Sequence, residues 1–163
     1  MVALAISREQ VLEWLGEIPD PEIPVLTITD LGIVRGVSVG DAVVVELTPT
    51  YSGCPATEVI EQSVIDNLHE HGVEDVSIRR VLSPPWTTDW ISDEGRDKLK
   101  KYGIAPPAEA LSKRELLQGK RSIACPRCDS LNTAIVSEFG STACKASYTC
   151  SECLEPFEYF KCI

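Results

Sequence analysis

Residues 20–54 read DPEIPVLTITDLGIVRGVSVGDAVVVELTPTYSGC, and this stretch decides the fold. Two runs rich in β-branched residues, 33–39 and 42–47, flank Gly40-Asp41, which predicts a β-hairpin with a two-residue turn. The prolines before the hairpin exclude a helix there and indicate an extended, stiff segment. The hairpin is therefore expected to join a constrained segment to a cysteine.

That cysteine, Cys54, stands at the start of a predicted helix. Pro55 suits the first helical position, where a missing N–H has no consequence, so Cys54 is expected at the N-cap. The unpaired N–H groups and the positive end of the helix dipole then favour the thiolate over the thiol. The alternative is a small buried thiol that only caps the helix.

Three acidic residues, Asp20, Glu22 and Asp30, precede the hairpin. Turn and cap chemistry is their ordinary explanation, because short carboxylates accept hydrogen bonds from nearby backbone amides. A thiolate near carboxylates also suits iron or an iron–sulfur cluster. The sequence leaves both roles open for Asp20 and Asp30.

Helical periodicity lies on both sides of the hairpin. A capping box beginning at Ser7 starts one helix, and an amphipathic pattern predicts a second over 57–71, ended by Gly72. Residues 76–82 predict a third strand beside the hairpin. The expected fold class is α+β, a small α-β-β-α-β domain with a C-terminal zinc-ribbon-like module.

Trp86 and Trp90 follow the third strand, and either they cover the edge of the sheet or they form a lip over Cys54 or a docking surface. A further helix is expected over 96–101, closed by Gly103.

Two C-x-x-C pairs near the C-terminus give the strongest motif of the chain. Each pair lets two sulfurs bind one ion from a tight turn, and two such turns complete a tetrahedral S₄ site. Strand-forming runs at 133–139, 146–149 and 157–161 predict a zinc ribbon around it. We expect structural zinc, with mononuclear iron or a cluster as the alternative, on Cys125, Cys128, Cys150 and Cys153.

Two cysteines remain outside this set. Cys144 is interpreted as an uncoordinated or core thiol, with a ligand to a transient cluster as the alternative, and Cys162 has no assigned role. Asp129 follows the first C-x-x-C pair, where glycine is common, so the sequence defines the geometry of that turn less closely.

Composition narrows the class of protein. The chain has 163 residues, seven cysteines and a formal net charge of −10. The acidic excess lies in residues 1–104, which disfavours nucleic-acid binding. Long apolar runs and a signal-peptide pattern are absent from the sequence, so we expect a cytoplasmic protein whose cysteines bind metal and are not paired as disulfides. The expected organisation is a domain at 1–104, a linker at 105–121 and the ribbon at 122–163.

A thiol enzyme would need a base beside Cys54. The two histidines, His69 and His71, lie at the far end of the predicted helix, roughly 22 Å away at ~1.5 Å per residue. They cannot form a Cys–His dyad with Cys54 within one chain. The sequence therefore indicates a carrier or adaptor, and a thiol enzyme only if a partner chain or a second copy supplies the base.

Residues 20–32 and TPTYSGCP at 48–55, in the order α-β-β-α-β, resemble the iron–sulfur assembly domain of SufT-like proteins over about residues 8–82. That resemblance implies that Cys54, with Asp20 and Asp30, forms the working site for iron–sulfur maturation. One thiolate per chain would need a homodimer to bridge a cluster.

The segment from Pro84 to Pro107, the CPRC turn and FGSTACKASYTCSECLEPFEYFK extend the resemblance to the PaaD family of phenylacetate degradation. The resemblance implies the oxygenase and reductase subunits of the multicomponent phenylacetyl-CoA epoxidase as partners. It implies an accessory role in assembly or repair of their iron–sulfur or iron centres, with the oxygenase chemistry in those partners. The alternative is a structural docking subunit in which Cys54 is inert.

Overall fold

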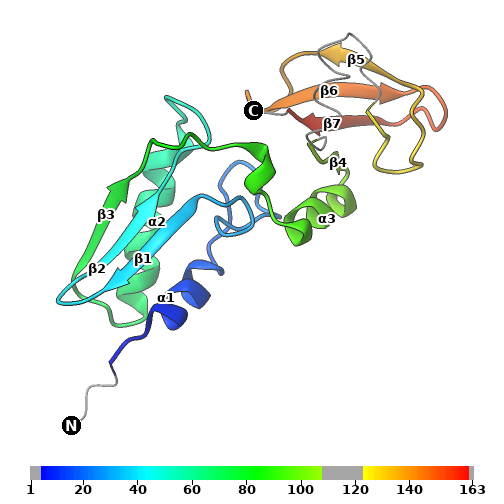
Figure 1. Cartoon of the computed structure of the whole chain (residues 1–163). Coiled ribbons are helices and arrows are strands. Elements are labelled where there is room, and N and C mark those ends of the chain that lie inside the picture. Colours follow the sequence, from blue (N-terminus) through cyan, green and yellow to red (C-terminus); the bar gives the residue numbers. More distant parts are fainter. Residues whose placement is uncertain (1–4, 108–122, 162–163) are drawn as a thin grey trace. The chain divides into compact units, whose positions relative to one another are not determined.

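The computed structural model describes residues 5–107 and 123–161, which fold as two compact units, Met1–Trp86 and Thr87–Ile163 (Figure 1). Each unit has its own sheet and its own buried residues. We therefore describe them one at a time.

The first unit follows the predicted order of elements. It comprises α1 (Arg8–Leu15), β1 (Val34–Val39), β2 (Val43–Leu47), α2 (Ala56–Glu70) and β3 (Val76–Arg80). The strands form one sheet in the order β1-β2-β3, with β1 and β2 antiparallel and β2 and β3 parallel. Helix α2 crosses behind this sheet in Figure 1, so the α+β class is confirmed.

The core of this unit joins the helices to the sheet. Because side chains three or four apart share one face of a helix, the buried face of α2 is formed by Ala56, Ile60, Val64 and Leu68. Alternate residues of β2 are buried, as expected for a strand with one face toward the core: Val43, Val45 and Leu47.

The hairpin turn differs from the prediction. Val39 pairs with Val43, so the loop holds three residues, and the expected two-residue turn at Gly40-Asp41 is wrong. Within the loop, the N–H of Gly40 donates to the carbonyl of Ala42. The Val43 N–H donates to the Asp75 carbonyl at 2.8 Å. Strand β2 therefore begins at the residue that bonds to the segment just before β3.

The proline-rich segment before β1 folds back on itself, which corrects the extended path expected from its prolines. Pro19 forms an antiparallel bridge with Thr27, and the N–H of Asp20 donates to the carbonyl of Leu26 at 2.8 Å. Ile23, Leu26 and Ile28 are buried. Burial of these apolar side chains outweighs the stiffness of the prolines, so the segment forms a compact loop.

Helix α1 begins as the sequence predicts. The Ser7 hydroxyl accepts the N–H of Gln10, and the Gln10 side chain accepts the N–H of Ser7. These two hydrogen bonds complete the capping box and satisfy two backbone donors that the first turn leaves unpaired.

Trp86 closes the first unit as a core residue. Its side chain is 3% exposed, and its indole N–H donates to the Leu31 carbonyl at 2.7 Å. A lip formed by Trp86 over Cys54 is therefore excluded. Trp90 ends a short 3₁₀ helix, Thr88–Trp90, in the second unit.

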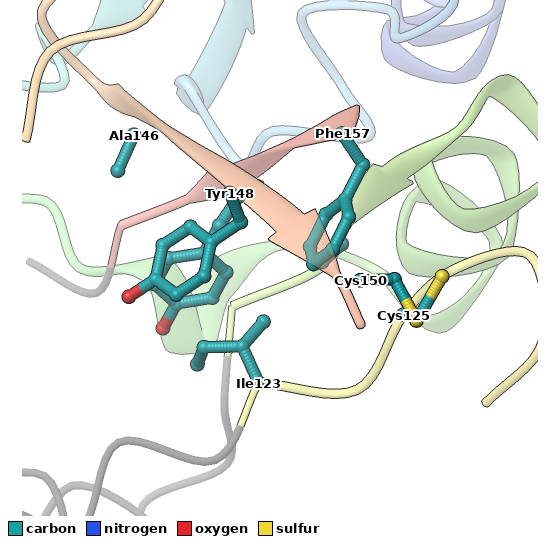
Figure 2. Close-up of a cluster of buried hydrophobic side chains, with 8 residues drawn as sticks. Ile123, Cys125, Ala146, Tyr148, Cys150 and Phe157 are labelled. Carbon is teal, nitrogen blue, oxygen red and sulfur yellow. The ribbon is translucent and has the colours of Figure 1, made fainter. Parts of the chain in front are cut away.

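The second unit is the predicted ribbon with a helical addition. It comprises α3 (Asp93–Tyr102), β4 (Ile104–Ala105), β5 (Thr133–Ser137), β6 (Lys145–Cys150) and β7 (Pro156–Phe160). The sheet order is β4-β7-β6-β5, with β4 parallel to β7 and the other pairs antiparallel. Figure 2 shows its core, in which the rings of Tyr148 and Phe157 lie beside smaller buried side chains such as Ile123 and Ala146, and the Tyr148 ring stacks on that of Phe157.

The division between the units differs from the boundary expected after residue 104. Strand β4 hydrogen-bonds to β7, and Lys100 of α3 forms an ion pair of 2.6 Å with Asp129 of the ribbon. These contacts make α3 part of the second unit. A strand of two residues is too short to leave a periodic signal in the sequence. The expected linker at 105–121 falls mostly outside the described residues.

Helix α2 ends in a Schellman motif that supplies a test of the fold. Gly72 has φ +84°. The Gly72 N–H donates to the His69 carbonyl, and the Val73 N–H donates to the Leu68 carbonyl. Both Leu68 and Val73 are buried, which is the hydrophobic contact that accompanies this motif.

We predict that Gly72→Ala destabilises the first unit by about 1 kcal/mol, because a residue with Cβ is disfavoured in the left-handed region. The matched control is Gly40→Ala. Gly40 has no positive φ, and a Cβ added there would meet nothing within 4 Å. Urea unfolding followed by circular dichroism measures both variants. Equal stabilities of the two would contradict the assignment of the motif.

Candidate functional site

Two sites emerge, a thiol cluster in the ribbon and the surroundings of Cys54. In the ribbon, the sulfurs of Cys125, Cys128, Cys150 and Cys153 lie within 4.8 Å of one another. The Sγ–Sγ distances are 3.7 Å between Cys125 and Cys153 and 3.6 Å between Cys128 and Cys150. A tetrahedral ion with zinc–sulfur bonds of ~2.3 Å requires sulfurs about 3.8 Å apart, whereas a disulfide requires about 2 Å. The cluster therefore fits a zinc ion and excludes disulfides among these four cysteines.

Two matching turns hold the four sulfurs. The N–H of Cys125 donates to the Ser130 carbonyl at 2.9 Å, and the N–H of Cys150 donates to the Glu155 carbonyl at 3.0 Å. The residue after the second cysteine has positive φ in both turns, 59° at Asp129 and 65° at Leu154. Asp129 stands where glycine is common, yet the turn keeps the same form as the second one, because aspartate tolerates the left-handed region.

The surroundings of each sulfur set the ease with which its thiol ionises. The Cys153 backbone N–H, donating to the Cys150 sulfur, lowers the pKa of Cys150 to about 7. The Ser130 N–H acts in the same direction on Cys128, but desolvation and the neighbouring sulfurs outweigh it and raise the pKa of Cys128 to about 12. Cys150 therefore ionises more readily than Cys128, and an ion bound in the cluster would favour the thiolate form of its ligands.

The thiol cluster is continuous with the core of the ribbon. Cys125 and Cys150 are 0% and 1% exposed. Figure 2 shows their sulfurs close together at one end of the buried cluster, with the ring of Phe157 nearby. Metal binding and packing therefore stabilise the same small unit.

The remaining ribbon cysteine of the described chain is Cys144. It is buried, and its sulfur lies 3.0 Å from the Thr142 hydroxyl, which confirms the core alternative. Cys162 lies outside the described residues.

We predict that the protein binds one zinc ion and that Cys128→Ser loses it, because a closed S₄ site needs all four thiolates. Metal analysis of the purified protein measures the content, and Cys54→Ser serves as the control that keeps its zinc. Full zinc occupancy in Cys128→Ser would contradict this assignment.

The Cys54 site lies at one end of the sheet in the first unit. The N–H of Thr48 donates to the Ile33 carbonyl at 3.0 Å, which joins the entry to β1 and the exit from β2. The N–H of Val81, just after β3, donates to the Leu47 carbonyl at the same end. The loops before β1 and after β2 therefore meet where the chain leads to Cys54.

Cys54 itself stands one residue earlier than predicted. Helix α2 begins at Ala56 with Pro55 as the N-cap, so the expected N-cap position of Cys54 is corrected. Pro55 already has right-handed helical φ and ψ, and no side chain at the N-cap accepts a hydrogen bond from the first turn. Cys54 is half-buried, and Gly53 before it has φ +77°. The glycine allows the sharp approach of the loop to the helix.

The carboxylates of Asp20 and Asp30 hold the loop before β1. Oδ1 of Asp20 accepts the N–H groups of Glu22 and Ile23 at 2.9 and 2.7 Å. Oδ2 of Asp30 accepts the N–H of Thr27 at 3.1 Å, and the Asp30 N–H donates to the Thr27 hydroxyl. Both aspartates are 7% exposed. Both carboxylates therefore accept hydrogen bonds from nearby backbone amides, which is the turn and cap role that the sequence left open for them.

The structure does not gather Cys54, Asp20 and Asp30 into a ligand group. Within residues 5–107 and 123–161, the four ribbon cysteines are the one set in which three or more candidate ligand atoms converge. His69 lies in the last turn of α2, at the opposite end of the helix from Cys54. The structure therefore agrees with the prediction that these two residues form no Cys–His dyad within the chain. Sequence reasoning missed the bond between Thr48 and Ile33, because a bond between two loop ends leaves no pattern.

Comparisons with known proteins agree with this arrangement. Residues 8–79 match the family described as "Iron-sulfur cluster assembly protein", and residues 109–161 match the family described as "PaaD zinc beta ribbon domain". The chain is 38% identical over 78 residues to the "Fe-S protein maturation auxiliary factor SufT" of Staphylococcus aureus, covering 45% of this chain and 85% of that protein.

A crystal structure of a domain of unknown function, DUF59, from Bacillus anthracis shares the fold with a TM-score of 0.53 and 26% identity. The match covers 56% of this chain and 90% of that one. The fold and the thiol cluster thus define a two-part class of protein, an iron–sulfur cluster assembly domain joined to a zinc ribbon.

Over 162 residues the chain is 51% identical to a protein of Escherichia coli K12 that is named as a subunit of a "Putative 1,2-phenylacetyl-CoA epoxidase". The match covers 97% of this chain and 96% of that protein. The chain belongs to this PaaD family. The described helices include none long and apolar enough to cross a membrane.

Proposed function

We propose that this protein assists the assembly or repair of iron–sulfur or iron centres in a multicomponent phenylacetyl-CoA epoxidase. Identity of 51% along nearly the whole chain to a protein named as an epoxidase subunit, and similarity of the first unit to a SufT maturation factor, support this role. The observation that carries it is the half-buried thiol of Cys54 at the start of α2. In this proposal the chain is an accessory protein, and the oxygenase chemistry resides in its partners.

Cys54 acts in this proposal as a transient ligand of the cargo. A thiolate is the ligand type that iron and iron–sulfur clusters prefer. No N-cap side chain accepts a hydrogen bond from the first turn of α2, so the N–H groups of that turn are left to other acceptors. A single protein thiolate leaves the other iron coordination positions to further ligands, from a second copy or from the client. Such incomplete ligation suits transfer better than storage.

Asp20 and Asp30 act through the shape of the loop. Their buried oxygens accept main-chain N–H groups that would otherwise be unpaired, and this fixes the loop before β1 at the end of the sheet that leads to Cys54. We assign them a positioning role in the proposed site, with Cys54 as the residue that touches the cargo.

The ribbon serves in this proposal to dock the partner. Leu154 is 79% exposed and has positive φ, although a leucine there is unfavourable both for its solvation and for its backbone. Leu131 is 61% exposed in the neighbouring loop, which the Asn132 side chain joins to Glu152. Exposed leucines on a rigid zinc-bound turn favour contact with another protein.

We predict that Cys54→Ser leaves the fold and the zinc content intact but lowers the iron and sulfide content of epoxidase subunits produced in the same cells. The matched control is Ser52→Ala, an exposed change in the same loop. Iron and acid-labile sulfide are measured on the purified oxygenase and reductase subunits. Epoxidase subunits with their full content of iron and sulfide, purified from cells that lack this protein, would contradict the proposal.

The alternative is a docking subunit in which Cys54 is inert, and the exposed leucines of the ribbon favour it independently. We predict that Leu154→Gly raises the stability of the ribbon by up to about 1 kcal/mol, because glycine adopts positive φ without strain. The same variant should co-purify less with the epoxidase subunits. Leu154→Asn is the second variant. Asparagine tolerates positive φ, as glycine does, and it also removes the apolar leucine side chain.

Thermal unfolding measures stability, and co-purification with the tagged oxygenase or reductase measures docking. If Cys54→Ser has no effect on loading while Leu154→Gly and Leu154→Asn both lose docking, the docking role alone remains. If both leucine variants dock as well as the native chain, the ribbon does not use Leu154.

A further inference from the structure

We propose that residues 88–107, the α3 segment, hold the first zinc turn closed and thereby slow the release of the zinc ion. This segment consists of the 3₁₀ helix, α3 and β4 (Figure 1). It lies between the two family matches, at 8–79 and 109–161, so neither match assigns it a role. All its residues belong to the second unit, and the proposal depends neither on Cys54 nor on the maturation role.

The four zinc ligands differ in their exposure. Cys125 and Cys150 are buried, Cys153 is half-buried and Cys128 is exposed. An S₄ site has no open coordination position, so the ion leaves only after one of the sulfurs has moved away from it. The exposed ligand is the one that a chelator in solution reaches first. Opening of the first zinc turn at Cys128 is therefore the expected first step of release.

The end of α3 lies against the residue on each side of Cys128. Lys100 Nζ lies 2.6 Å from Asp129 Oδ1. Arg127 Nη2 lies 3.4 Å from the point where a Cβ on Gly103 would stand. Gly103 has φ +95° and no side chain, which gives the guanidinium room beside the end of the helix. Outward movement of Cys128 with its turn therefore requires that both contacts change.

Strand β4 fixes the end of α3 to the core of the ribbon. It pairs in parallel with β7, and Leu99, in the last turn of α3, is fully buried. Ala105 of β4 is 2% exposed and belongs to the buried cluster that includes the zinc ligands Cys125 and Cys150. The α3 segment and the zinc site therefore share one core, and a change in one is felt by the other.

Arg96 joins the two ends of the α3 segment. Its Nη1 donates to the Pro107 carbonyl at 2.7 Å, and its Nη2 donates to the Thr88 carbonyl at 2.9 Å. Thr88 is fully buried, so the first end of the segment is also anchored. The guanidinium thus closes residues 88–107 into one loop, and the end of α3 is held in place from both sides.

The second zinc turn is held by a different part of the chain. The Ser151 N–H donates to the Asn132 carbonyl at 2.8 Å, and the Asn132 side chain donates to Glu152 at 3.0 Å. The loop before β5 therefore supports the second turn from within the ribbon. The first turn has its corresponding support in α3, which precedes the ribbon in the sequence.

The test is the rate at which excess chelator removes zinc from the zinc-loaded full chain. Lys100→Gln and Asp129→Asn should each speed release about two- to fivefold, the range expected for one exposed ion pair. The double variant should release zinc no faster than either single variant, because both changes remove the same contact. Asparagine keeps the turn, since it tolerates positive φ. Lys98→Gln is the matched control, because Lys98 pairs with Glu94 within α3.

Two further measurements examine the coupling from the backbone and from the metal. Gly103→Ala should speed release about fivefold or more, because a Cβ is disfavoured at positive φ. Since coupling is reciprocal, removal of zinc should speed hydrogen exchange at the amides of α3 and leave those of α2 protected.

Three results would overturn the proposal. The first is release from Lys100→Gln at the rate of Lys98→Gln. The second is an additive effect of Lys100→Gln and Asp129→Asn, and the third is an α3 whose amides keep their protection without zinc. A negative result leaves the role of Cys54 untouched, since the α3 segment and Cys54 belong to different units.

Discussion

Convergence of four sulfurs on one point is the constraint on which the second unit depends. The ribbon has a small buried cluster of eight residues, two of which are the metal-binding Cys125 and Cys150. So few apolar side chains provide little hydrophobic stabilisation, and small units of this kind need a metal or a disulfide. The Sγ–Sγ distances of 3.6 and 3.7 Å match the edge of a zinc tetrahedron. Zinc therefore completes the core as well as the site.

The two cysteine environments in this chain differ in what they can do. A zinc ion with four sulfur ligands has no open coordination position, so it is structural. Cys54 is alone at the start of a helix, on a loop whose glycine has φ +77°. Closed ligation suits permanence, and a single half-buried thiol suits exchange. This contrast is the physical basis of the proposal that the ribbon docks the partner and the first unit binds the cargo.

Attachment of α3 to the ribbon gives the second unit a surface that the zinc turns alone would lack. The strand pair β4–β7 and the ion pair of Lys100 with Asp129 hold the end of the helix beside the first zinc turn. Arg127 thereby comes to lie against Gly103, which provides room for it. This surface thus combines segments that lie far apart in the sequence.

By itself the sequence determined the local structure and the metal ligands, because periodicity, caps and C-x-x-C spacing act over a few residues. The order α-β-β-α-β, the capping box at Ser7 and the four zinc cysteines required nothing else. Only the tertiary structure decided the three-residue hairpin loop, the folding back of the segment from Pro19 to Thr27 and the membership of α3. The hairpin loop and the place of α3 depend on contacts between distant segments, Val43 with Asp75 and β4 with β7. The folding back depends on burial of Ile23, Leu26 and Ile28 in the core. Local patterns cannot encode such contacts, since burial of apolar side chains and pairing of strands are settled only when the whole chain folds.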